Sequence, residues 1–381
     1  MKRIQVVLAA TALLVLGAYS VRSEQAGPLP SSQTPPDLPF WAYGWATPEQ
    51  TVPTVPKPQP VHLSADDSVL LRIPGSSLAL RPSLFRRVRG DEGVKEVPDW
   101  APETHTPMPD IVRFGRSVRN SRGELMEGED GGIRGCGVCH SATGIGRPEN
   151  AGPAGLPLAY LLQQLEDFKN GLRVTADPKK ENGFRMASFA KLMTPEEARA
   201  ASEYFASLPF PPTMKVVETD TVPKTYAAGG MLEVLEGPHA GTEPIGERII
   251  EVAEHPELTA IRAPNAGYIA YAPVGSIKKG EALVAKGQCA SCHGRDLGGN
   301  APGAPRVKLG SLAPPLAGRS PTYMVRQLYE LKIGTRRGVM SRFMRPVVAD
   351  LSTLDMLNIA AYVASLAPPP RESISMQSAS R

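Results

Sequence analysis

All four cysteines of this 381-residue chain fall in two copies of one short pattern, Cys-x-x-Cys-His. The copies read CGVCH at residues 136–140 and CASCH at residues 289–293, so no cysteine is left over. In each copy a histidine directly follows a pair of thiols that are separated by two residues. The fold must therefore hold two similar thiol and histidine clusters that start 153 residues apart in the sequence.

Three kinds of chemistry use paired cysteines at this spacing. A disulfide within each pair would suit an oxidising compartment, but it leaves the two histidines unexplained. A four-cysteine zinc site normally brings both pairs into one small module, and again the histidines would be a coincidence. Covalent haem c uses every residue, because the two thiols bind the two vinyl groups of the porphyrin and the histidine binds the iron. The sequence therefore predicts two covalently attached haem c groups, on Cys136, Cys139 and His140 and on Cys289, Cys292 and His293.

Residues 1–25 have the layout of a secretory signal peptide. Lys2 and Arg3 precede the apolar stretch 6–18, and small or polar residues follow near Ser20. The stretch is short for a membrane span, which needs about 20 residues. We therefore expect cleavage near Ser20 and a periplasmic protein, with an uncleaved membrane anchor as the alternative. The formal charge of +4, without a basic run that contains aromatic residues, gives no indication of a nucleic-acid partner.

An internal repeat surrounds the two motifs. At a constant offset of 163 residues the matching residues are Ala154 and Ala317, Gly155 and Gly318, Tyr160 and Tyr323, Gln164 and Gln327, Leu165 and Leu328, Gly171 and Gly334, and Arg173 and Arg336. At a second offset of 158 residues they are Tyr204 and Tyr362, Ala206 and Ala364, Ser207 and Ser365, and Leu208 and Leu366. The repeat indicates two related domains, each built around one motif.

The second offset also selects two of the twelve methionines, Met186 and Met344, as a matching pair. An iron that transfers electrons usually has a sixth ligand, and methionine is a common one. The nearby methionines have no such partner, because Met193 aligns with Leu351 and Met340 aligns with Asn182. Core packing is the alternative role, since methionine often fills gaps. We predict Met186 and Met344 as the distal axial ligands.

Each copy also contains the pattern of two helices. Residues 160–172 and 323–333 have apolar residues at three- and four-residue spacing, and each stretch runs out at a glycine. Thr194, Pro195 and Glu197 form a capping box before the next helix, and Ser352 with Asp355 forms a weaker one. The predicted unit is a haem motif, a loop, a helix, a loop that carries the methionine, and a second helix.

Over residues 132–210 and 276–368 the chain resembles tandem class I cytochromes c, especially periplasmic two-haem cytochromes of the c-four type. The resemblance rests on CGVCH, CASCHG, the PLAGRSPTYMVRQL segment and the methionine-to-helix segments. It implies a mainly α fold with two helical haem domains, His/Met iron and an electron-carrying role. It also implies a proline beside each proximal histidine. Pro314 stands there in the second copy, whereas the first copy has Ala151, with Pro153 nearby.

The remaining segments carry no motif that indicates chemistry. Residues 26–60 are rich in proline and also contain Trp41 and Trp45, so we expect an extended tether. We expect a strand-containing N-terminal extension at residues 61–131, with runs 68–73 and 77–80 and a helix at 111–116, and a disordered tail at 369–381. The linking segment 211–275 has strand-like runs at 248–252 and 267–273, so we expect it to pack on the haem domains. The histidines in these segments are expected at the surface; they are His62, His105, His239 and His255.

Charge distinguishes the second copy from the first. Residues 300–347 contain nine lysines and arginines and a single acid, Glu330. The residues that make this excess are Arg306, Lys308, Arg319, Arg326, Lys332, Arg336, Arg337, Arg342 and Arg345. Clustered around a haem edge, they would steer an acidic partner toward the second haem.

These features predict an electron carrier with no catalytic residues. Its donor would be a periplasmic dehydrogenase or a quinol-oxidising complex, and its acceptor an oxidase or reductase of a respiratory chain. The alternatives are a di-haem enzyme, either a peroxidase or a sulfur-compound oxidoreductase, and a haem subunit of a dehydrogenase complex. A peroxidase needs an open iron site, and sulfur-oxidising relatives often use a cysteine ligand. Both predicted methionines are assigned and no cysteine is spare, so the carrier is favoured.

Overall fold

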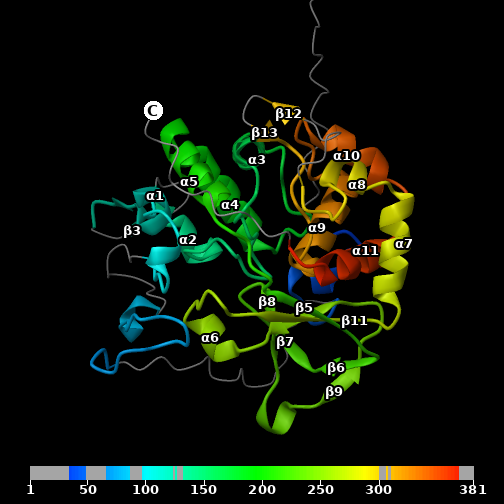
Figure 1. Ribbon diagram of the computed structural model, residues 1–381, viewed down its shortest axis with the longest axis horizontal. Coiled ribbons are helices and arrows are strands. Elements are labelled where there is room, and N and C mark those ends of the chain that lie inside the picture. The colour runs from blue at the N-terminus through cyan, green and yellow to red at the C-terminus, as the bar shows by residue number, and fades with distance from the viewer. Residues whose placement is uncertain are drawn as a thin grey trace, which may run out of the picture.

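The computed structural model describes residues 34–48, 66–85, 97–122, 125–126, 132–299, 306–307 and 310–368. Two groups of helices lie side by side, and short β-sheets from the segment between them lie beneath (Figure 1). The predicted signal peptide or anchor at residues 1–25 and the predicted tail at residues 369–381 fall outside the described residues.

The first helical group surrounds the first cysteine pair. Its helices are α1 (Asp110–Arg113), α2 (Cys136–His140), α3 (Leu158–Lys169), α4 (Glu181–Leu192) and α5 (Pro195–Ser207). The start of α5 is the predicted capping box, since Thr194 and Glu197 accept hydrogen bonds from each other's backbone N–H groups. α3 ends just before Gly171, whose φ of 66° suits glycine. The core of this group is Ile111, Val112, Ile133, Ala154, Phe189, Met193, Ala201, Tyr204, Phe205 and Leu208.

The second helical group repeats this arrangement around the second cysteine pair. Its helices are α7 (Ser276–Lys286), α8 (Ala290–His293), α9 (Pro321–Ile333), α10 (Ser341–Val348) and α11 (Thr353–Ser365). α7 crosses α11 so closely at Gly280 that a Cβ there would overlap the carbonyl oxygen of Asn358. The capping box predicted as weak is complete, because Ser352 and Asp355 bond reciprocally. Buried side chains of α9 and α11, including Val325, Tyr329 and Leu357, form the largest core cluster.

Both methionines selected by the repeat lie on helices, so the prediction of methionine loops was wrong. Met186 lies within α4 and Met344 lies within α10. In α4, Met186, Phe189 and Ala190 recur at three- and four-residue spacing, which gives the segment one apolar side and favours a helix. In α10, Phe343, Met344 and Val347 do the same. Each unit therefore has a methionine-bearing helix in place of the expected loop.

The linking segment folds into small sheets. In its three-stranded sheet, β11 (Tyr268–Ala272) lies between β10 (Ile250–Ala253), which is antiparallel to it, and β5 (Met214–Glu218), which is parallel. The remaining elements are the pair β6 (Thr221–Pro223) and β9 (Thr242–Pro244), the hairpin β7 (Thr225–Ala228) and β8 (Met231–Val234), the 3-10 turn η5 (Gly237–His239) and helix α6 (Pro256–Ala260). β10 and β11 match the two predicted runs. Ile249, Ala270 and Ala272 share the core of the second helical group, so this linker is packed as expected.

Residues 34–48 form part of the core, although we expected a tether there. Trp41 is 4% exposed and Tyr43 is fully buried, and both lie in the core cluster of the second helical group. The short 3-10 helix η1 (Phe40–Tyr43) packs against α9, and the Tyr329 hydroxyl donates a hydrogen bond to Asp37 (2.6 Å). The side chains of Trp41 and Tyr43 bury enough apolar surface to hold this proline-rich segment in place. The part of the predicted tether at residues 49–60 lies outside the described residues.

The N-terminal extension packs on the linking segment and on the first helical group. Trp100 is 2% exposed, and its indole donates to the Ile261 carbonyl (2.7 Å). Only one bridge, Leu71 to Leu80, forms in the runs predicted as strands. The helix predicted at 111–116 is shortened to α1, because β1 starts at Gly115. The short elements of this region are η2 (Pro82–Leu84), η3 (Pro102–Thr104), β1 (Gly115–Arg116) with β4 (Ile133–Arg134), and β2 (Val118–Arg119) with β3 (Leu125–Met126). A separate pair, β12 (Arg306–Val307) with β13 (Gly310–Ser311), belongs to the second copy.

Within these described ranges, no single helix has both the length and the apolar composition that a membrane span requires. α10 and α11 meet that test only when they are joined, and the pair is bent by 115°.

Candidate haem-binding sites

The first motif forms one helical turn, α2, which places its three functional residues on one side. Cys136, Cys139 and His140 stand at positions i, i+3 and i+4 of this helix. The Cys136 sulfur lies 3.4 Å from the Ile111 carbonyl oxygen, and burial raises the pKa of its thiol to about 12. No disulfide joins the four cysteines, and the described residues hold no group of three or more metal-binding side chains.

Both motif histidines are oriented in the same way. The Nδ1 atom of His140 lies 2.7 Å from the Ala151 carbonyl oxygen, and that of His293 lies 2.8 Å from the Pro314 carbonyl oxygen. A hydrogen bond from Nδ1 to a carbonyl leaves Nε2 unprotonated and available to a metal. Burial lowers the pKa of both histidines, which also favours the neutral ring that binds iron. The Ala151 carbonyl thus makes the same contact as the Pro314 carbonyl of the second copy.

A cavity of about 220 Å³ lies beside α2, many times the roughly 10–15 Å³ that one water molecule needs. Its wall includes Cys136, Cys139, His140 and Met186, so the structure brings together the four residues predicted for the first site. Met193 also lines this cavity and was not predicted. Its position in the fold makes Met193 a second candidate ligand, whereas the repeat excluded it because its counterpart is a leucine. Ligation of the first iron by Met186 therefore stays a prediction.

Polar atoms without a protein partner lie in the same wall. Among the described residues, Glu149 Oε2, Thr175 Oγ1 and Ser202 Oγ are buried there with no hydrogen bond. Two buried basic side chains, Lys180 and Arg326, also line it, and burial lowers the pKa of Lys180 to about 7. A largely apolar wall that also carries unpaired hydroxyls and basic side chains fits a flat apolar ring with two carboxylates, as haem has.

The second motif has a similar local structure. Cys289 precedes α8, which contains Cys292 and His293. Met344 is half-buried on α10, and α10 packs against α9. Ligation of the second iron by Met344 stays a prediction.

The repeat residues meet where the two helical groups join. Arg173 lies opposite Arg336 in an isolated antiparallel bridge. Backbone hydrogen bonds flank it on both sides, from Val174 N to Thr335 O (2.9 Å) and from Arg337 N to Leu172 O (2.7 Å). The Arg173 guanidinium donates to Tyr323 Oη (2.7 Å), Gln327 Oε1 (2.8 Å) and Gln164 Oε1 (2.9 Å). The Arg336 guanidinium donates to the equivalent atoms, which are Tyr160 Oη (3.0 Å), Gln164 Oε1 (3.0 Å) and Gln327 Oε1 (3.1 Å).

Four of the basic residues expected to form a docking patch bond within the protein instead. Arg326 is 5% exposed and bonds to backbone carbonyls of residues 42 and 148. Arg319 donates to the carbonyls of Gly152 (2.6 Å) and Ala154 (2.9 Å). Arg336 and Arg337 also bond across the interface. Lys332, Arg342 and Arg345 are exposed, so for them the docking hypothesis stays a prediction. The side chains of Arg306 and Lys308 lie outside the described residues.

The histidines expected at the surface divide into three cases. His239 and His255 are exposed, as predicted. His62 lies outside the described residues. The side chain of His105 is only 3% exposed, so that prediction was wrong. Nothing in its local sequence marks it, because its burial depends on residues nearly a hundred positions away on α5.

Comparison with known proteins agrees with this geometry. The family model "Cytochrome c" matches residues 277–367. Cytochrome c-554(548) of Halomonas halodenitrificans is 35% identical over 79 residues, which are 21% of this chain and 84% of that protein. The chain belongs to the cytochrome c family. It is a haem-binding electron-transfer protein, and this family binds haem c covalently.

A longer similarity covers more than half of the chain. The thiosulfate dehydrogenase electron acceptor of Stutzerimonas stutzeri is 24% identical over 233 residues, 61% of this chain and 78% of that protein. Among solved structures, thiosulfate dehydrogenase from Marichromatium purpuratum is 24% identical with a TM-score of 0.37; the match covers 61% of this chain but only 37% of that one. Cytochrome c4 from Pseudomonas stutzeri is 21% identical with a TM-score of 0.36, and 61% of this chain matches 93% of it.

Proposed function

We propose that the chain is a di-haem electron carrier with one haem c on each Cys-x-x-Cys-His segment. The observation that carries the proposal is the shared orientation of His140 and His293, each with Nδ1 bonded to a backbone carbonyl and Nε2 left for iron. The family model matches the second copy alone. Support for the first haem comes from the cavity that gathers Cys136, Cys139, His140 and Met186.

The residues of the chain have distinct roles in this proposal. Haem c with two permanent axial ligands exchanges one electron at a time. The thiols of Cys136 and Cys139, and those of Cys289 and Cys292, hold the two porphyrins. His140 with Met186, and His293 with Met344, would bind the two irons. The arginine, tyrosine and glutamine contacts at the interface keep the two sites in one rigid body, so that an electron entering one site can pass to the other.

We propose a periplasmic dehydrogenase as the donor, with a quinol-oxidising complex as the second choice, and a terminal oxidase or reductase as the acceptor. Support for a dehydrogenase comes from the relative that is named as an electron acceptor of thiosulfate dehydrogenase. Export would depend on the N-terminal 25 residues, either as a cleaved signal peptide or as a membrane anchor.

Intact-mass measurement of the purified holoprotein tests the number of haems. The wild-type protein should carry the mass of two haem groups. Replacing Cys289 and Cys292 by alanine should remove one of them, and replacing Cys136 and Cys139 should remove the other. A wild-type protein that carries one haem would overturn the di-haem proposal.

An enzyme assay separates the carrier from the alternative function. A carrier should be reduced by a dehydrogenase and reoxidised by an acceptor, with no turnover of thiosulfate or peroxide when it is supplied alone. Turnover of either compound by the purified protein would instead assign it as an oxidoreductase enzyme.

A further inference from the structure

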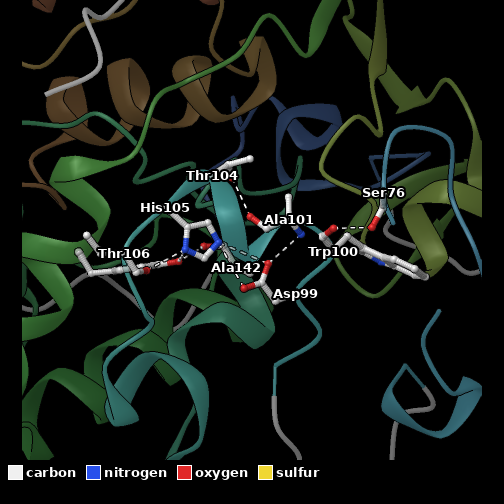
Figure 2. Close-up of polar contacts among 9 residues, drawn as sticks. Ser76, Asp99, Trp100, Ala101, Thr104, His105, Thr106 and Ala142 are labelled. Carbon is white, nitrogen blue, oxygen red and sulfur yellow. Dashed lines mark hydrogen bonds and ion pairs between the residues drawn. The ribbon is translucent and has the colours of Figure 1, made fainter. Parts of the chain in front are cut away.

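His105 lies in the N-terminal extension, outside the part of the chain that matches the cytochrome c family. It follows the 3-10 turn η3, and its ring lies between Asp99 and Thr106 (Figure 2). Its side chain is 3% exposed, although the neighbouring residues 102–104 and 106–107 are at the surface. A buried histidine in an exposed segment requires specific partners.

Both ring nitrogens of His105 face hydrogen-bond acceptors. Nδ1 lies 2.8 Å from the Thr106 carbonyl oxygen, and Nε2 lies 3.3 Å from an Asp99 carboxylate oxygen. A neutral imidazole has one N–H and could satisfy only one of these acceptors, whereas the imidazolium satisfies both. Burial alone would lower the pKa of His105, but hydrogen bonds to Asp99 and Thr106 and the charges of Asp99 and Glu103 raise it above its ordinary value. From α5, the ionisable group that faces the ring is Tyr204.

Tyr204 connects this histidine to the first haem segment. Its hydroxyl lies 3.3 Å from His105 Nδ1 and donates a hydrogen bond to the Ala142 carbonyl oxygen (2.7 Å). Ala142 is the second residue after His140. The contact therefore fixes the backbone just beyond the iron-binding histidine.

A second connection runs through aromatic rings. The Tyr204 ring meets the His105 ring edge-on at 5.6 Å and the Phe205 ring at 5.3 Å. The Phe205 ring packs edge-on against the His140 ring at 6.1 Å. Edge-to-face contacts of this kind restrict ring orientation. Movement of Tyr204 would therefore shift both the backbone just after His140 and the orientation of the His140 ring.

We propose that His105, held as an imidazolium by Asp99, is a positioning residue for His140 that acts through Tyr204 and Phe205 and tunes the first haem site. A positive charge near an iron favours its reduced form, because the reduced iron carries one positive charge less. Loss of the His105 proton therefore lowers the potential of the first haem. It also weakens the contacts that hold Tyr204. The inference rests on the proposed function only in requiring haem at the first segment.

The second copy lacks this arrangement. Tyr362 is the counterpart of Tyr204, and within the described part of the chain its hydroxyl has no hydrogen-bond partner. The two haems should therefore respond differently to pH. Tyr362→Phe serves as the matched control for Tyr204→Phe. His255, which is paired with Glu257 (3.4 Å) at the surface, serves as the control for His105.

A spectroelectrochemical titration of the holoprotein between about pH 6 and 9 tests the proposal. In the wild type, one midpoint potential should fall as the pH rises through the His105 pKa, while the other changes less. His105→Phe should remove this step. Asp99→Asn should move it to lower pH, because the carboxylate no longer stabilises the imidazolium. Asp99→Asn keeps the size of the side chain, so it decides the question if His105→Phe does not fold.

Tyr204→Phe separates positioning from simple charge. It removes the hydroxyl contacts but keeps the ring, so it should reduce the potential step while NMR still shows His105 titrating. His255→Gln and Tyr362→Phe should leave the step unchanged. The proposal is overturned if the wild type shows no step, or if the step survives in His105→Phe. A haem count made on the same samples shows separately whether the di-haem proposal has failed.

Discussion

Arg173 and Arg336 are corresponding residues of the two repeats, and they lie opposite each other in one antiparallel bridge. Each guanidinium donates to the tyrosine and the glutamine of the other repeat. The repeat thus builds the interface between the helical groups, in addition to two similar domains. The arrangement is reciprocal, so a change on one side should disturb both.

Arg173→Ala should lower the free energy of unfolding by about 3 kcal/mol. Arg173 is 7% exposed, and its loss removes the donor of Tyr323 Oη and one of the two donors of Gln164 Oε1 and Gln327 Oε1, which keep only Arg336. A charged hydrogen bond contributes about 1.5–3 kcal/mol, and a polar group left unpaired costs about 1–3 kcal/mol. Urea denaturation of the holoprotein measures the change. Arg199→Ala is the control, because Arg199 forms an exposed i,i+4 pair with Glu203 worth about 0.3–0.5 kcal/mol. Equal effects of the two substitutions would contradict the importance of the interface.

Gly280→Ala should destabilise the second haem domain by about 1–3 kcal/mol or more. The added methyl group overlaps the Asn358 carbonyl oxygen where α7 crosses α11, and overpacking of this kind forces helices apart. Thermal denaturation measures the effect. Glu281→Ala, at the exposed position next to it, should change stability by less than about 0.5 kcal/mol. If Gly280→Ala melts at the same temperature as the wild type, the two helices cross less closely than the structure indicates.

Met186→Leu and Met193→Leu distinguish the two methionines of the first cavity. Met186→Leu should remove the first haem's share of the long-wavelength methionine-to-iron absorption band and lower its potential. Met193→Leu should keep the band and cost less than about 1.5 kcal/mol, since Met193 is a core residue and the swap conserves volume. If the band is kept in Met186→Leu and lost in Met193→Leu, Met193 is the ligand. Met344→Leu is the same test for the second haem.

His105→Gln should reduce stability in a pH-dependent way. The pKa of His105 is raised in the folded protein, so its pairing contributes fully below the ordinary value of about 6.5 and is lost as the pH rises through the raised value. The stability difference between variant and wild type should therefore shrink as the pH increases. Denaturation at several pH values measures this difference. A difference that is constant with pH would show that His105 is not charged in the folded protein.

Much of the haem region could be predicted because its signals are local or periodic. The capping boxes at Thr194 and Ser352, the glycines after α3 and α9, and the amphipathic spacing each depend on a few neighbouring residues. The hydrogen bonds that orient the motif histidines were not predicted, because each accepting carbonyl lies well along the chain, 11 residues after His140 and 21 residues after His293. The helical positions of Met186 and Met344 were missed, although their spacing to Phe189 and Val347 already had helical period.

Other features depend on contacts between residues that are distant in the sequence, so composition alone predicted them wrongly. Proline content suggested a tether where Trp41 and Tyr43 are in fact core residues. Local charge suggested a docking patch where Arg319 and Arg326 bond to carbonyls of the first half of the chain. The burial of His105 depends on Tyr204, which no local pattern connects to it.

The central claim is that the chain holds two haems with His/Met ligands. A redox titration of the purified holoprotein, followed by its absorption spectrum, tests this claim most directly because it counts the haems and reports their ligation together. We expect two one-electron steps from six-coordinate haems, with the methionine-to-iron band present in the oxidised protein. A single step, or a five-coordinate haem in the reduced protein, would contradict the account.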